Sequence, residues 1–113
     1  MQNPSLTIIP SVPVWKKGDI LCFDRKFYDG LARYAELWPG PVTCVMQSSA
    51  TPLSGFGVVE ATVGAMPFKC VALQENELVG MEHLRNSTIV MASADAYDQL
   101  HISALCRQNG IKC

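Results

Sequence analysis

The sequence predicts an α/β fold with a mostly parallel sheet and flanking helices. Residues 23–46 show a helical pattern, a proline-rich stop and an apolar strand in direct succession. The same alternation returns near the C-terminus, where the apolar run 88–92 precedes a second helical pattern. With 49% apolar and 17% charged residues, the chain can bury strands on both faces. Strands that alternate with helices are typical of parallel sheets with right-handed crossovers.

The first helix is predicted to follow Asp24, which is placed to cap its N-terminus. Apolar residues recur at helical spacing on one face, and charged residues lie on the other. The apolar face comprises Phe27, Leu31, Tyr34, Ala35 and Trp38, and the charged face Lys26, Asp29, Arg33 and Glu36. The segment 39–41, Pro-Gly-Pro, ends the helix because proline lacks a backbone donor. Residues 42–46 then predict a strand covered on both faces.

Ahead of this helix, the apolar residues 6–9 predict a short strand. The segment 10–18 holds two prolines, Pro10 and Pro13, and predicts an irregular, semi-rigid loop. Residues 19–23 predict a second short strand that leads into the helix.

Beyond the helix and its strand, residues 47–66 are rich in glycine, serine and proline and predict a loop. We expect a small hairpin or an extra strand within it, near residues 58–63. Residues 68–73 predict a further strand, and residues 77–85 a short helix.

The C-terminal part repeats the strand and helix pattern. Residues 88–92 form a continuous apolar run that predicts a buried strand, and Ser93 is placed to cap the next helix. That helix is expected to carry Tyr97, Leu100, Ala104 and Leu105 on one side. It is expected to end at Gly110. Residues 111–113 then open a further strand, so we expect one domain over 1–113 that is truncated within its sheet.

Composition argues against several classes of partner. Nine Lys and Arg against ten Asp and Glu give a net charge of −1, which provides no basic field for nucleic acid and no polybasic run for anionic lipid. No apolar run approaches the roughly 18 residues that span a bilayer, and no leader pattern is present. We therefore expect a cytoplasmic chain without a transmembrane segment.

The cysteines predict core thiols. The five of them lack C-x-x-C spacing and are odd in number, so neither a disulfide framework nor a zinc site is expected. Cys22, Cys44 and Cys70 each lie inside an apolar run that predicts a strand, where a reduced cysteine acts as a small buried apolar residue.

Ligands of parallel sheets bind beyond the carboxyl ends of the strands, which selects the loop 10–19, the loop from Gln47 and the turn 92–95. In that turn, Ser93 and Asp95 either contact a sugar hydroxyl or cap the helix. At the first helix, Lys26 and the aspartates on either side of it either orient a ligand or form a solvated face.

Familiar catalytic signatures are absent from the sequence. The segment 54–57 has two glycines in G-x-G spacing but no third glycine, and predicts a turn rather than a dinucleotide site. His83 and His101 are isolated, without a partner at metal-ligand spacing. The sequence motifs alone therefore provide no catalytic apparatus.

Several segments together resemble a known family. They are residues 8–14, 18–19, 23–31, 34–42 and 92–98. The pattern resembles the N-terminal part of bacterial GT-B glycosyltransferases of the glycosyltransferase 4 kind, which implies a Rossmann-like domain. In that family two such domains face each other, the first binding mainly the acceptor and the second the nucleotide-sugar donor.

The resemblance implies an acceptor-binding domain in carbohydrate biosynthesis, cytoplasmic or peripheral at the inner membrane face. The family's paired glutamates would lie beyond Cys113, in the missing donor domain, so the chain alone is expected to be inactive. The acceptor is expected to be a glycan or a lipid-linked glycan, with no metal and no cofactor in this chain. The implied acceptor contacts are Trp15, Lys26, Gly30, Ser93 and Asp95.

Two alternatives remain open. One is a non-catalytic Rossmann-like interaction module that forms homodimers through an exposed sheet edge. The other is a receiver-like flavodoxin fold, which requires an acidic cluster after its first strand and an aspartate after its third. The sequence places neither convincingly, so this alternative ranks last.

Overall fold

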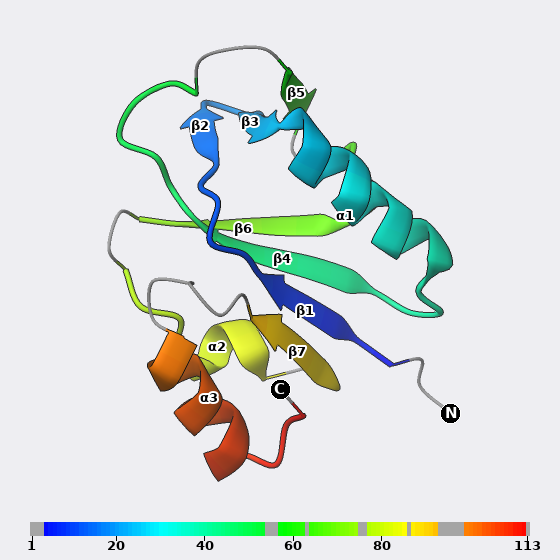
Figure 1. The fold of residues 1–113 in the computed structure, drawn as a ribbon, viewed down its shortest axis with the longest axis vertical. Coiled ribbons are helices and arrows are strands. Elements are labelled where there is room, and N and C mark those ends of the chain that lie inside the picture. The colour runs from blue at the N-terminus through cyan, green and yellow to red at the C-terminus, as the bar shows by residue number, and fades with distance from the viewer. Residues whose placement is uncertain are drawn as a thin grey trace.

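A parallel sheet of four strands is the centre of the fold (Figure 1). The computed structural model describes residues 4–53, 57–62, 64–74, 77–85, 87–92 and 99–112. The sheet has the order β6-β4-β1-β7 and is formed by β1 (Leu6–Ile9), β4 (Val42–Gln47), β6 (Lys69–Leu73) and β7 (Ile89–Ala92). All three pairings are parallel. The α/β class and the parallel sheet predicted from the sequence are thus confirmed.

A second, antiparallel sheet lies on one side of the first. Its order is β2-β3-β5, from β2 (Trp15–Lys17), β3 (Ile20–Asp24) and β5 (Val58–Thr62). The extra strand expected near residues 58–63 is β5, but the prediction of an irregular loop over 10–18 is wrong for β2. Lys17 pairs with Ile20 across a Gly-Asp turn in which Gly18 has a φ of 59°. A two-residue turn that begins with glycine is a hairpin signal, and it outweighs the two prolines upstream.

Helix α1 (Arg25–Leu37) connects the antiparallel sheet to β4. It begins as predicted, because the Asp24 carboxylate accepts a hydrogen bond from the Phe27 N–H at 3.1 Å. It ends at Trp38, directly before the Pro-Gly-Pro segment. The connection then returns to the sheet, where the N–H of Leu6 donates to the carbonyl of Pro41 at 3.0 Å. The last turn of α1 therefore lies at the amino end of the sheet, and its first turn lies toward the carboxyl ends of the strands.

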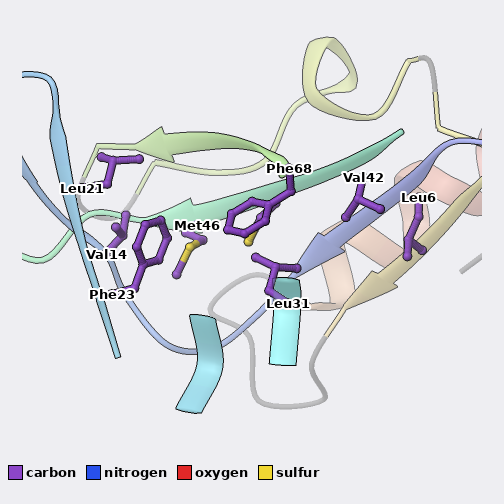
Figure 2. Packing of buried hydrophobic residues seen from close by; sticks show 9 residues of the cluster. Leu6, Val14, Leu21, Phe23, Leu31, Val42, Met46 and Phe68 are labelled. Carbon is purple, nitrogen blue, oxygen red and sulfur yellow. The ribbon is translucent and has the colours of Figure 1, made fainter. Parts of the chain in front are cut away.

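Two hydrophobic clusters cover the two faces of the parallel sheet. The first packs α1 and β3 against β1, β4 and Phe68, and its central residues are drawn in Figure 2. The second packs α2 (Met81–Leu84) and α3 (Gln99–Gln108) against the opposite face, through Val45 and Val90 among others. Alternate residues of β4 serve the two clusters, since Cys44 and Met46 belong to the first and Val45 to the second. The central strands β1 and β4 are therefore covered on both faces.

The C-terminal helix differs from the prediction in the face it buries. Leu100 is 84% exposed, whereas Ile102 and Cys106, one helical turn apart, are buried. Apolar residues occur around much of this helix, so spacing alone did not fix the buried side. The short helix predicted over 77–85 is present as α2, which covers four of those residues, Met81–Leu84.

The end of α3 matches the expected glycine stop. Gly110 has a φ of 69°, and the N–H of Ile111 donates to the carbonyl of Cys106 at 2.9 Å, which is the pattern of a Schellman motif. The chain then reaches β7, where Lys112 forms a parallel bridge with Ile89 and its carbonyl accepts from the N–H of Val90 at 2.8 Å. Of the further strand predicted from residue 111, the described residues show only this isolated bridge at Lys112.

Candidate ligand-binding groove

A small groove lies between α1 and the part of the sheet formed by β1 and β7. It encloses about 250 Å³. It is lined by Ile8 and Met91 from the sheet and by Lys26, Phe27, Gly30, Leu31 and Tyr34 from α1. Ile8 and Met91 are direct partners in the β1–β7 pairing, so their side chains lie on the same face. We call this hollow the α1 groove.

The groove exists because α1 covers the sheet incompletely. Leu31 is the buried residue of the helix, whereas Tyr34 is 47% exposed and Met91 is 41% exposed. The sequence predicted Tyr34 on the buried face and residues 88–92 as fully buried, and both predictions are wrong in this respect. The helix packs over β1 and β4, so the face of β7 beside it stays open. The exposed parts of the Tyr34 and Met91 side chains form walls of the groove.

Gly30 makes the groove accessible from the helix side. A Cβ placed on this residue meets no atom within 4 Å, and the helix passes through it without a left-handed conformation. Glycine inside a helix costs roughly 0.5–1 kcal/mol relative to alanine. No neighbouring atom requires a glycine at position 30, although glycine destabilises the helix there. The missing side chain leaves open space in the groove.

Lys26 provides the groove's charge. Among the described residues that line the groove, it alone is charged, and its side chain is exposed. No ion pair to Lys26 is found among the residues that the structure describes. The first turn of α1 contains no acidic residue, so the helix N-terminus adds a partial positive charge, which the capping carboxylate of Asp24 offsets in part.

The structure brings together only some of the predicted site residues. Lys26 and Gly30 line the same groove. Trp15 lies in β2, half-buried and paired with Cys22, and it is not among the residues that line the groove. Ser93 and Asp95 lie outside the described residues. Among the charged residues at the start of α1, Asp24 is the helix cap, as predicted.

Five groove residues were missed by the sequence analysis as candidates for a site: Ile8, Phe27, Leu31, Tyr34 and Met91. Each is apolar or aromatic and sits in a pattern that predicts burial, so no local signal distinguished them. The carboxyl-end rule selected the loops that follow the strands. The groove instead opens on the face of the sheet, between a helix and two strands.

A second hollow follows the outer edge of β7. It encloses about 700 Å³ and lies between that strand and α3, with Ser103, Arg107 and Ile111 among its lining residues. Because Lys112 pairs only with the start of β7, the remainder of this edge faces the hollow. We call it the β7 edge groove.

The histidines have structural partners. The Nδ1 of His83 accepts from the N–H of Gly80, and the Nε2 of His101 lies 2.9 Å from the carbonyl of Val79. Within the described ranges, no three His, Cys, Asp or Glu side chains gather as metal ligands, and no helix is long and apolar enough to cross a membrane.

Comparisons of the chain with protein-family models, with curated proteins and with solved structures found no match.

Proposed function

We propose that this chain is the Rossmann-like, acceptor-binding part of a glycosyltransferase of the glycosyltransferase 4 kind. Such an enzyme moves a sugar from a nucleotide-sugar donor to a glycan or lipid-linked acceptor. The observation that carries the proposal is the shared location of Lys26 and Gly30. Both belong to the segment 23–31 that resembles the family, and both line the α1 groove. The donor site and the catalytic groups belong to a second domain, so this chain alone is expected to bind without turnover.

The chemistry of the groove favours a lipid-linked acceptor over a free glycan. Its floor is made of apolar side chains, which suit an aliphatic chain. The ammonium of Lys26 at its margin suits a phosphate. A free glycan instead requires several polar groups that converge on its hydroxyls, and the described lining offers the Tyr34 hydroxyl and Lys26.

Calorimetric titration with a short-chain isoprenyl phosphate tests this function. Binding is expected for the unmodified chain, and Lys26→Met is expected to weaken it by roughly tenfold because one charge-assisted hydrogen bond is lost. Lys16→Met is the matched control, since Lys16 is an exposed lysine of β2 and does not line the groove. Equal weakening by both variants, or tight binding of a UDP- or GDP-sugar to this chain, would contradict the proposal.

The edge of β7 favours a second candidate, a non-catalytic module that self-associates. The N–H of Val90 already donates to the carbonyl of Lys112 across this edge. The outward backbone groups of β7 are therefore oriented for pairing with another strand. Because every second residue of a parallel strand faces the same neighbour, Ala92 presents its N–H to the β7 edge groove. In a symmetric dimer, two such edges pair with each other.

Sedimentation equilibrium over a range of concentrations separates the two candidates. A concentration-dependent dimer that Ala92→Pro abolishes would favour the module, because proline removes the outward donor at an edge position. A monomer at all concentrations would exclude it. Binding of the isoprenyl phosphate by that monomer would then support the transferase proposal.

A further inference from the structure

Three sulfur-containing side chains converge on one face of the parallel sheet. Cys44 of β4 and Cys70 of β6 are direct partners in the parallel register, and Met46 follows Cys44 on the same side of β4. The Cys70 thiol donates to the Met46 Sδ at 3.9 Å, and the register places Cys44 directly beside Cys70. The three side chains thus form one connected group, which we call the sulfur cluster.

We infer that Cys44, Met46 and Cys70 form a binding site for a soft monovalent metal ion of the Cu(I) class. Thiolate and thioether sulfur are the ligands that select such ions. With metal–sulfur bonds of about 2.3 Å, three ligands in a trigonal plane lie roughly 4 Å from one another. The 3.9 Å between Cys70 Sγ and Met46 Sδ fits that spacing. The register adds Cys44 as the third sulfur ligand, because it is the direct partner of Cys70.

The surroundings suit a soft ion and exclude the common alternatives. Cys44 and Met46 are buried, and the cluster around them is apolar, as Figure 2 shows for Met46 between Phe23 and Phe68. Zinc prefers a fourth nitrogen, sulfur or oxygen ligand, and calcium or magnesium requires oxygen. Among the described residues, no third cysteine, histidine or carboxylate joins this group.

A route from solvent reaches the site at Cys70. This residue is half-buried and lines a hollow of about 580 Å³ together with Met66, Phe68 and Lys69. An ion can enter there and meet Cys70 first. Binding by both thiolates releases two protons and leaves one net negative charge on the complex. Lys69 lines the same hollow and offsets part of that charge.

Anaerobic titration with Cu(I), in competition with a coloured Cu(I) chelator, tests the inference. One ion per chain is expected, with a first coordination shell of sulfur alone in X-ray absorption spectra. Cys44→Ala and Cys70→Ala are each expected to weaken binding by at least about tenfold. Met46→Leu, which keeps the side-chain volume, is expected to weaken it less while leaving the fold intact.

The matched control replaces the other cysteines, as Cys22→Ala, Cys106→Ala and Cys113→Ser combined, and is expected to keep the affinity. Cys22 and Cys106 are buried in β3 and α3, outside the sulfur cluster. Undiminished Cu(I) affinity in Cys70→Ser and Met46→Leu would overturn the inference. So would a coordination shell that contains nitrogen or oxygen in the unmodified chain, a measurement that does not depend on any variant folding.

Discussion

The indole nitrogen of Trp38 donates a hydrogen bond to the carbonyl oxygen of Pro4 at 2.9 Å. The two residues are 34 positions apart, and the bond joins the C-terminal cap of α1 to the segment that leads into β1. Trp38 is half-buried and packs on the same hydrophobic cluster as Leu31. The Trp38 side chain therefore joins the end of the helix to the segment where the sheet begins.

Replacement of Trp38 by phenylalanine should destabilise the fold by about 1 kcal/mol, because the apolar packing largely persists while the part-buried carbonyl of Pro4 loses its partner. Urea unfolding followed by circular dichroism measures the change. Trp15→Phe serves as the control, since no hydrogen bond of the Trp15 indole is found in the described part of the chain. An equal loss in both variants would show that the indole bond contributes nothing specific.

The N-terminal cap of α1 provides a second prediction. Asp24→Ala should cost about 1 kcal/mol of unfolding free energy, because the Phe27 N–H loses its acceptor at the helix start. Asp24→Ser retains an acceptor and should recover most of that loss. Thermal unfolding distinguishes the two variants, and Asp19→Ala is the matched control at an exposed aspartate of the preceding turn. A serine variant as unstable as the alanine variant would contradict the capping role.

Gly30 and Gly18 form a contrasting pair. Gly30→Ala should stabilise the chain by roughly 0.5–1 kcal/mol, because the helix gains a better residue and the new Cβ meets open space. Gly18→Ala should destabilise it, since the hairpin requires a φ of 59° there. Melting temperatures measure both effects. Gly30→Leu should also fill the α1 groove and abolish phosphate-ligand binding while the chain stays folded, whereas retained binding would show that the ligand lies elsewhere.

Local signals in the sequence predicted much of this fold. The stretch from Asp24 to Gln47 carries a cap, an amphipathic stripe and a proline stop, and each acts within a few residues. The sequence predicted β3 and β5 as strands but did not predict that they pair. Almost forty positions of chain separate the two paired segments. The α1 groove depends on how far a helix covers the neighbouring strands. That property follows from packing and has no counterpart in residue spacing, which is why Met91 was predicted to be buried.

The sulfur cluster gives a prediction in pH for the metal-free chain. Hydrogen bonding with the Cys44 thiol lowers the pKa of Cys70 from its ordinary value, although burial opposes the shift. Cys44 is affected in the opposite direction, because the same bond and its burial raise its pKa. Folded Cys70 should therefore be a thiolate at pH values where an unfolded cysteine is still protonated. The stability that this ionisation contributes is present above the ordinary thiol pKa and is lost as the pH falls through the folded value.

Alkylation with iodoacetamide, followed by mass spectrometry across a pH series, measures the effect site by site. Cys70 should react at lower pH than a cysteine in an unstructured peptide, and Cys44 should remain unreacted, because only the thiolate attacks and Cys44 is fully buried. Cys44→Ala removes the hydrogen-bonding partner and leaves burial as the remaining influence, so the Cys70 profile should move to higher pH. A profile that does not move in this variant would mean that the thiol pair does not control the ionisation of Cys70.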